Sequence, residues 1–171
     1  TEELHFDEES AAGHDDMVYL WQWPKLQTLF AFTGHVDPVF CVRFTHDGRQ
    51  LISGGSDRTV RIWDVESLKH LSTIKLPGRV HDMAISPDDR WMAVACRDIA
   101  FARETPACKS VWLVPLTEEG ERREFRGHAG FVWSVAFSPD GKYLASGPGG
   151  TWNSTGYHPS QANSVILWDV E

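Results

Sequence analysis

The sequence is poor in cysteine, with Cys41, Cys96 and Cys108 as its only three. Their spacing fits no zinc-binding motif, and a low, odd number is typical of a reducing compartment, so we expect a cytoplasmic protein. Long apolar runs are also missing, because no stretch reaches the roughly 18 residues that a membrane-spanning helix needs. The N-terminal segment lacks the basic and apolar regions of a signal peptide. We therefore predict no metal, no other cofactor and no membrane partner.

Positive charge is absent from residues 1–16, which hold seven carboxylates and no Lys or Arg. The whole chain carries a formal net charge of −8, so residues 17–171 are close to neutral. No basic stripe is present that would follow a phosphate backbone, and we expect no nucleic-acid partner. Apolar residues make up 42% of the sequence, which is enough for a packed core. We expect residues 1–14 to form a flexible acidic segment and residues 15–171 to fold.

An internal repeat is the most informative feature of the sequence. The segment GHVDPVFCVRFTHDGRQLISGGSDRTVRIWDV at 34–65 returns as GHAGFVWSVAFSPDGKYLASGPGG at 127–150, followed by NSVILWDV at 163–170. In each copy, alternating apolar residues predict a first strand, and an Asp-Gly pair then predicts a hairpin turn into a second and a third strand. The predicted second and third strands are 50–54 and 59–63, and 143–147 and 164–168. The alternating residues are Phe40, Val42 and Phe44 in one copy and Trp133, Val135 and Phe137 in the other.

Two further copies are degraded. The segment SPDDRWMAVACRD at 86–98 matches the second-strand region, and KSVWLVPL at 109–116 matches the third strand, with Val114 in place of Trp. Upstream, DDMVYLWQW at 15–23 matches a third strand with Trp21 in the Trp position, and LQTLFAF at 26–32 predicts one more strand. The chain therefore holds successive units with the same strand pattern.

These repeats resemble the WD-repeat family, whose unit is a four-stranded antiparallel blade of a β-propeller. The resemblance covers residues 15–170 and rests on the Gly-His openings and the Trp-Asp ends. It implies an all-β, partial propeller of about three and a half blades. The expected divisions are a partial blade at 15–33, a blade at 34–76, a degenerate blade at 79–126 and a partial blade at 127–171.

The resemblance also implies a buried hydrogen-bond network of His, Ser, Asp and Trp. These residue types also occur in a hydrolase triad, but their register in the repeat favours a structural role, because a buried imidazole and indole need partners. We therefore predict no catalytic residues. Gly150 stands in the Asp position of the last copy, and the degenerate unit has Val94 and Val114 in the Ser and Trp positions. The predicted members are His35, Ser53, Asp57 and Trp63 in the complete set, and His128, Ser146 and Trp168 in the partial set.

Two insertions, at 98–109 and 148–162, separate second from third strands and project from the face of the Gly-His loops. Members of the family commonly bind partners on that face, and aromatic residues and Arg are frequent interface anchors. The alternative is that the insertions are disordered tips. Cys96 and Cys108 flank the first insertion, either as two free thiols or as a disulfide. The candidate partner-binding residues are Asp37, Arg79, Phe101, Arg103, Phe131, Trp152, Tyr157 and His158.

The function expected from this pattern is that of a non-catalytic scaffold whose loop face binds protein partners. A second hypothesis is structural: the chain is a half-ring that completes a propeller by homo-oligomerisation or with further sequence. A third is that the chain is an accessory domain of a larger enzyme. The solution mass and the length of the encoding gene would separate these hypotheses.

Overall fold

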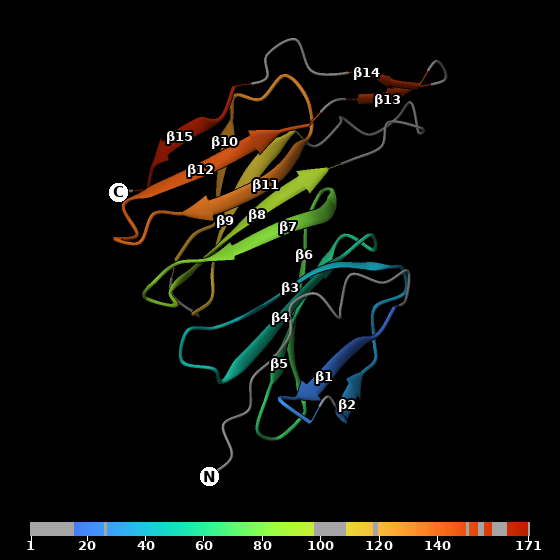
Figure 1. Cartoon of the computed structure of the whole chain (residues 1–171). Coiled ribbons are helices and arrows are strands. Elements are labelled where there is room, and N and C mark those ends of the chain that lie inside the picture. Colours follow the sequence, from blue (N-terminus) through green and yellow to red (C-terminus); the bar gives the residue numbers. More distant parts are fainter. Residues whose placement is uncertain are drawn as a thin grey trace.

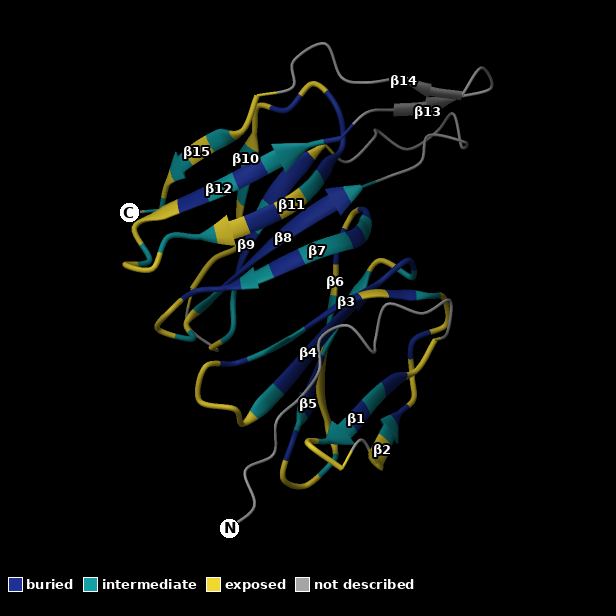
Figure 2. Cartoon of the chain, in the orientation of Figure 1, coloured by how far each residue is buried: buried dark blue, intermediate teal, exposed yellow. Residues whose placement is uncertain are grey.

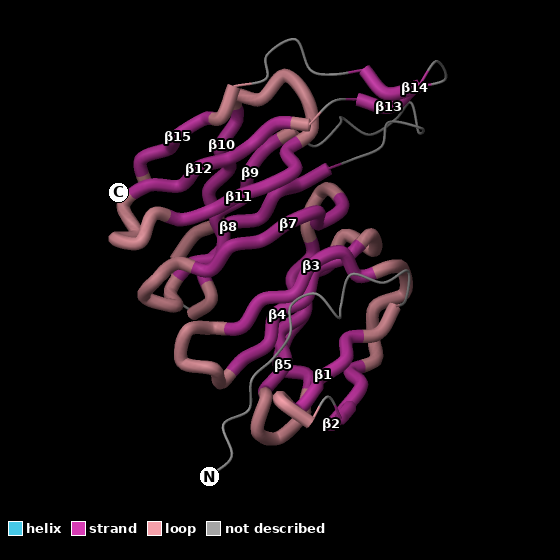
Figure 3. The backbone as a smooth tube through the Cα atoms, viewed as in Figure 1, coloured by secondary structure: helices cyan, strands magenta, loops and turns pink. Residues whose placement is uncertain are grey.

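The computed structural model describes residues 16–25, 27–97, 109–117, 120–149 and 164–170, together with the backbone of 151–153 and 156–158. Over this part of the chain the backbone forms strands joined by turns and bends (Figure 3). The predicted all-β class is therefore confirmed. Within the described ranges no helix has the length and apolar character needed to cross a membrane.

Two four-stranded antiparallel sheets form the centre of the structure (Figure 1). In both sheets the hydrogen-bonded strands follow one another in chain order. Sheet 2 consists of β3 (Val39–Phe44), β4 (Gln50–Gly55), β5 (Thr59–Asp64) and β6 (His70–Lys75). Sheet 3 consists of β7 (Arg79–Ile85), β8 (Trp91–Arg97), β9 (Ser110–Pro115) and β10 (Arg123–Arg126).

Smaller sheets flank this pair. Sheet 1 joins β1 (Val18–Gln22) to β2 (Gln27–Phe32), and sheet 4 joins β11 (Val132–Phe137), β12 (Tyr143–Pro148) and β15 (Ile166–Asp169). The backbone of the second insertion contains a separate hairpin of β13 (Thr151–Asn153) and β14 (Gly156–His158).

The sheets stack face to face, with β3, β7 and β11 as adjacent inner strands (Figure 1). A separate apolar core fills each space between successive sheets, and Figure 2 shows the buried residues concentrated along the middle strands. Phe32 meets Trp63 between sheets 1 and 2, Met83 and Met92 lie between sheets 2 and 3, and Leu144 lies between sheets 3 and 4. Stacked antiparallel sheets with neighbouring inner strands form a partial propeller, as the repeat predicts.

The ends of the inner strands lie along two edges of the stack. We define the loop end by residues 34–38, 77–79 and 127–131, at the start of β3, β7 and β11, and by residues 148–149, at the end of β12. We define the turn end by the hairpin turns at 45–50, 86–91 and 138–143. The two ends lie at opposite edges of the stack in Figure 1, so a group at one end is remote from a group at the other.

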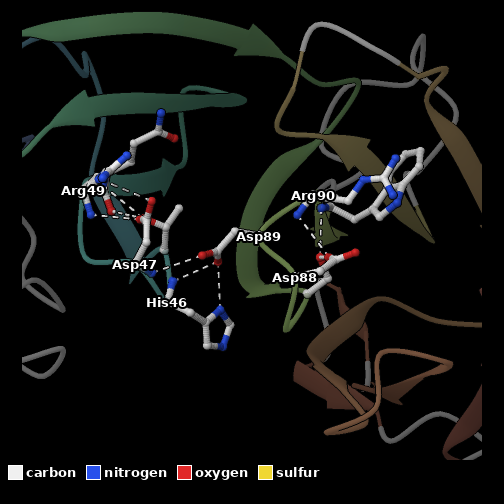
Figure 4. Close-up of polar contacts among 10 residues, drawn as sticks. His46, Asp47, Arg49, Asp88, Asp89 and Arg90 are labelled. Carbon is white, nitrogen blue, oxygen red and sulfur yellow. Dashed lines mark hydrogen bonds and ion pairs between the residues drawn. The ribbon is translucent and has the colours of Figure 1, made fainter.

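The turn of sheet 3 departs from its two counterparts. Gly48 and Gly141 adopt left-handed backbone conformations in their turns, whereas the matching residue of sheet 3 is Asp89, with φ of 55°. The Asp89 carboxylate accepts hydrogen bonds from the backbone N–H groups of His46 at 2.8 Å and Asp47 at 3.1 Å, and contacts the His46 ring nitrogen at 2.8 Å (Figure 4). A non-glycine residue is uncommon in this conformation, although Asp is among those that adopt it more often, and here the Asp89 carboxylate bonds to sheet 2.

A β-bulge interrupts each inner strand near the loop end. The register shifts between Val39 and Cys41 in β3, and the equivalent shifts in β7 and β11 fall at His81 and Trp133. The predicted alternation placed Phe40 on the same face as Val42, and this is wrong: Phe40 is 40% exposed, whereas Val42 is buried. The physical reason is that a bulge adds one residue to a strand and turns its side chain away from the core.

Candidate functional site

The hydrogen-bond network of sheet 2 joins the loop that precedes β3 to β4 and β5. The Nδ1 atom of His35 lies 2.8 Å from Oδ2 of Asp57, and its Nε2 lies 2.8 Å from Oγ of Ser53. The indole N–H of Trp63 donates to the same Ser53 oxygen at 2.9 Å. Thr59 donates its hydroxyl to Asp57 at 2.7 Å and thereby fixes the carboxylate. The Ser53 hydroxyl is therefore engaged by both an imidazole and an indole.

Burial and hydrogen bonding define the proton positions in this network. Desolvation lowers the pKa of His35, although the hydrogen bond and charge of Asp57 act in the opposite direction. Burial acts to raise the pKa of Asp57, but hydrogen bonds from Thr59 and His35 outweigh it and leave that pKa below its ordinary value. A neutral His35 then donates a hydrogen bond from Nδ1 to Asp57 and accepts a hydrogen bond from the Ser53 hydroxyl at Nε2. Ser53 is 0% exposed, which argues against a nucleophilic role for its hydroxyl.

Sheet 4 holds a smaller version of the network. His128 Nε2 lies 2.7 Å from Ser146 Oγ, and the Trp168 indole N–H donates to that oxygen at 2.7 Å. Burial lowers the pKa of His128. The predicted Asp position, Gly150, lies outside the described residues.

Sheet 3 replaces the network with apolar packing. Val94 and Val114 are both buried and belong to the core between sheets 2 and 3. Val94 pairs with Trp112 and Met92 pairs with Val114, so the register across β8 and β9 matches that across β4 and β5. In sheet 3, dispersion and apolar burial therefore take the place of the side-chain hydrogen bonds of sheet 2, while the backbone ladder is kept.

The bulge residues form a row across the loop end of the inner strands. The rings of Phe40 and His81 are 6.0 Å apart, and those of His81 and Trp133 are 4.3 Å apart in an edge-to-face arrangement. The Nδ1–H of His81 donates to the Trp133 backbone carbonyl at 3.2 Å. Burial lowers the pKa of His81, which keeps the ring neutral at physiological pH. We call these three residues the bulge row.

Asp82, next to the bulge row, ties three inner strands together. Its Oδ1 atom accepts a hydrogen bond from Arg43 of β3 at 2.8 Å, and its Oδ2 atom accepts one from the backbone N–H of Val135 in β11 at 3.0 Å. A single carboxylate of sheet 3 therefore bonds to both neighbouring sheets. Both of its oxygens are occupied, so the Asp82 charge is largely compensated by fixed partners.

Arg97, at the loop end of β8, lies over aromatic rings of sheet 4. Its guanidinium carbon is 4.9 Å from the centre of the Trp133 ring and 5.5 Å from that of Phe131. Gly149 packs so tightly on Trp133 that a Cβ atom at position 149 would overlap the indole Nε1 atom. The stack of Gly149, Trp133 and Arg97 thus requires glycine at position 149.

Comparison with known proteins identifies the architecture. The family model described as "WD domain, G-beta repeat" matches residues 26–64, 68–98 and 120–169. The chain belongs to the WD-repeat family. It is 31% identical over 146 residues to Eukaryotic translation initiation factor 3 subunit I of Culex quinquefasciatus, covering 82% of this chain and 44% of the relative.

Two other relatives match the chain with similar identity and coverage. The chain is 31% identical over 147 residues to Eukaryotic translation initiation factor 3 subunit I of Drosophila melanogaster, covering 82% of this chain and 45% of the relative. It is 29% identical over 139 residues to Small ribosomal subunit protein RACK1 of Neurospora crassa, covering 80% of this chain and 43% of the relative. The chain therefore spans less than half the length of these curated relatives.

The partner-binding residues predicted from the WD repeats fall into three groups. Asp37 is exposed and Arg79 half-buried at the loop end, whereas Phe131 is only 5% exposed and lies beneath Arg97. Phe131 could therefore affect a partner surface only by supporting Arg97, which covers its ring. The backbone of the β13–β14 hairpin contains Trp152, Tyr157 and His158. Phe101, Arg103 and Cys108 lie outside the described residues, and Cys96 is buried at the end of β8.

Sequence reasoning missed the bulge row, Asp82 and Arg97. A signal existed for two members of the row, because Phe40 and Trp133 follow Gly-His at the same distance in the two intact WD repeats. The alternation of these residues predicts only a strand, whereas the structure places both aromatic residues at β-bulges. Across the part of the chain that the structure describes, no group of three or more His, Cys, Asp or Glu residues is placed to hold a metal ion.

Proposed function

We propose that this WD-repeat chain is a non-catalytic scaffold that binds a protein partner at its loop end. The observation that carries the proposal is the bulge row with the adjacent Arg97, which brings aromatic rings and a cation together at the loop end of three strands. Phe40 is 40% exposed at one end of the row, although its ring is large and apolar. Aromatic residues and Arg supply most hot spots of protein interfaces.

The relatives support an assembly role. Their names describe one as a subunit of an initiation factor and the other as a protein of the small ribosomal subunit. We propose that the partner of this chain also belongs to a multi-subunit assembly, and that the chain acts in the cytoplasm. On this proposal the loop end supplies recognition, and the buried networks hold the strands that carry it.

The test is partner capture by matched variants of the full 171-residue chain. Phe40→Glu places a charge at the exposed end of the bulge row, and Arg49→Glu places one at the turn end, where the Arg49 side chain is 84% exposed. We expect the first variant to lose the proteins captured by the parent chain and the second to retain them. If both variants capture the same proteins as the parent, the loop end is not the binding surface.

A second candidate function is structural, and exposed apolar side chains on the outer sheets favour it. On β2, Leu29 and Phe30 are 41% and 37% exposed, and in sheet 4 Leu167 is 64% exposed. Apolar surface of this kind invites association with another sheet. In this hypothesis a second copy or further sequence covers sheets 1 and 4. Light scattering tests it, because a stable monomer at high concentration would contradict pairing between copies.

A further inference from the structure

Strand β6 forms the outer edge of sheet 2. Among the residues that the structure describes, this sheet runs in the order β3-β4-β5-β6, so β6 is bonded to β5 on one side only. Its residues are mostly exposed, and Leu71 is 51% exposed in spite of its apolar side chain. An edge strand of this kind is a surface onto which an extended segment of another chain can add.

The hydrogen-bond pattern of β6 determines which backbone groups face outward. The N–H of Leu76 donates to the Arg58 carbonyl at 2.9 Å, and the register with β5 then continues without a shift past Thr73. In an antiparallel ladder every second residue directs its N–H and C=O groups away from the partner strand. Thr73 and Lys75 hold those positions in β6. In agreement with this, the Lys75 carbonyl accepts a hydrogen bond from the Arg122 side chain, just before β10, at 3.1 Å.

A pocket of about 350 Å³, which we call the rim pocket, opens beside β6 between sheets 2 and 3. Ile62 and Ile74 of sheet 2 and Val114 and Leu116 of sheet 3 line it, and all four belong to or pack against the apolar core between these sheets. Its volume lies at the lower end of the roughly 300–1,000 Å³ of ligand-binding pockets. Because side chains alternate along a strand, a segment added beside β6 would direct every second side chain toward this pocket.

The charges around β6 restrict which segment can add to it. Residues 69–75 include two Lys and one His but no Asp or Glu. Ile74 lines the rim pocket, so the alternation places the exposed Lys75 on the opposite face of β6. Glu121 lies between two residues that line the rim pocket, which disfavours a second carboxylate on that side. Lysines on an edge strand also oppose pairing with a second copy of the same basic strand. The segment that fits is therefore apolar toward the rim pocket and acidic toward Lys75.

We propose that the outer edge of sheet 2 is a docking site for an extended acidic segment of a protein partner, which adds to β6 as a fifth strand. Its backbone bonds to Thr73, its apolar side chains enter the rim pocket, and its alternate carboxylates lie beside Lys75. In strand addition of this kind, main-chain hydrogen bonds supply affinity and side-chain pockets supply selectivity. The bulge row lies on the inner strands, so this second surface goes beyond the proposed function.

Capped heptapeptides test the docking site on the full 171-residue chain. In the test peptide Glu and Val alternate; in one control Lys takes the place of Glu, and in the other Ser takes the place of Val. Binding is followed by the fluorescence anisotropy of the labelled peptides. We expect the Glu–Ser peptide to bind at least roughly tenfold more weakly than the Glu–Val peptide, because no apolar side chain fills the rim pocket. The Lys–Val peptide should also bind more weakly, because its charges meet Lys75.

Hydrogen exchange locates the bound peptide. Because the Thr73 N–H faces away from β5, a strand added to β6 would accept a hydrogen bond from it. We therefore expect the Glu–Val peptide to slow exchange of the Thr73 amide, measured by NMR, and to leave the amides of β3, at the other edge of the sheet, unchanged.

Matched variants separate strand addition from folding. Thr73→Pro removes an N–H that faces away from β5, and proline is tolerated on edge strands at such positions. It should weaken binding of the Glu–Val peptide at least roughly fivefold, the loss expected for one main-chain hydrogen bond, and leave the thermal midpoint close to that of the parent chain. Lys75→Glu should weaken binding of the Glu–Val peptide roughly two- to fivefold and strengthen binding of the Lys–Val peptide. Lys142→Glu, in the turn of sheet 4, and Phe40→Glu, in the bulge row, should bind both peptides as the parent chain does.

Several outcomes would overturn the docking site at β6. They are a failure of the parent chain to bind the Glu–Val peptide, equal binding of all three peptides, and binding that does not slow exchange of the Thr73 amide. Full binding by both Thr73→Pro and Lys75→Glu would likewise place the peptide elsewhere. If Thr73→Pro fails to fold, the titrations of Lys75→Glu and the exchange of Thr73 in the parent chain decide the matter. None of these results bears on the loop end, which partner capture by Phe40→Glu tests separately.

Discussion

Replacing Ser53 by Ala removes the one atom that links the imidazole and the indole of sheet 2. The Ser53 oxygen lies 2.8 Å from His35 Nε2 and 2.9 Å from Trp63 Nε1, and all three residues are 3% exposed or less. Ala leaves two buried polar atoms without partners. Each unpaired atom costs about 1–3 kcal/mol, so we expect Ser53→Ala to lower the free energy of unfolding by about 2–6 kcal/mol.

Ser146→Ala is the matched control, because Ser146 makes the same two bonds in sheet 4. There the Trp168 side chain is only half-buried and His128 is 8% exposed, so water can reach the groups left behind. We expect a loss of about 1–2 kcal/mol. Urea unfolding of both variants measures the difference as a shift in midpoint at constant slope. Equal losses, or a larger loss for Ser146→Ala, would refute the argument from burial.

Three other predictions follow from contacts between sheets and from the lowered histidine pKa values. Asp82→Ala should lower the free energy of unfolding by about 1.5–3 kcal/mol, and Asp82→Asn by less, because Asn keeps an acceptor; urea midpoints compare them. Gly149→Ala should displace Trp133 and abolish its ring-current shift on the His81 ring in proton NMR spectra. The free energy of unfolding should fall as the pH decreases below 6.5, because the unfolded chain then binds more protons than the folded chain. Thermal midpoints measured across that range test this, and unchanged midpoints would contradict it. The histidines concerned are His35, His81 and His128.

Local sequence patterns predict the strands of this protein because each depends on neighbouring residues. The predicted second strand at 50–54 and third strand at 59–63 differ from β4 and β5 by one residue at one end. The repeat also pointed to His35 and Ser53, and the structure places their side chains within hydrogen-bond distance. A residue type that recurs at one position of a repeat meets the same environment each time, which is why the repeat register points to these residues.

Contacts between sheets could not be predicted from local sequence patterns. Asp82 occurs in the degenerate unit, and nothing in its local sequence shows that its carboxylate bonds to Arg43 and Val135. Likewise, Asp89 replaces a glycine that the turn prefers, and only the fold reveals that its carboxylate bonds to residues 46 and 47. A bulge is equally hidden, because one extra residue changes which face Phe40 occupies without altering its apolar character.

The turn of sheet 3 has a consequence for how the chain unfolds. Sheet 3 has lost its internal network, yet Asp82 and Asp89 bond it to its neighbours. In a linear array of repeats, stability is a sum of the intrinsic stability of each unit and the coupling between adjacent units. The middle unit, sheet 3, therefore has a low intrinsic stability and a strong coupling to the units on either side. Its amide protons should therefore exchange with solvent only when sheets 2 and 4 open with it, so that the most degenerate repeat reports the cooperativity of the whole array.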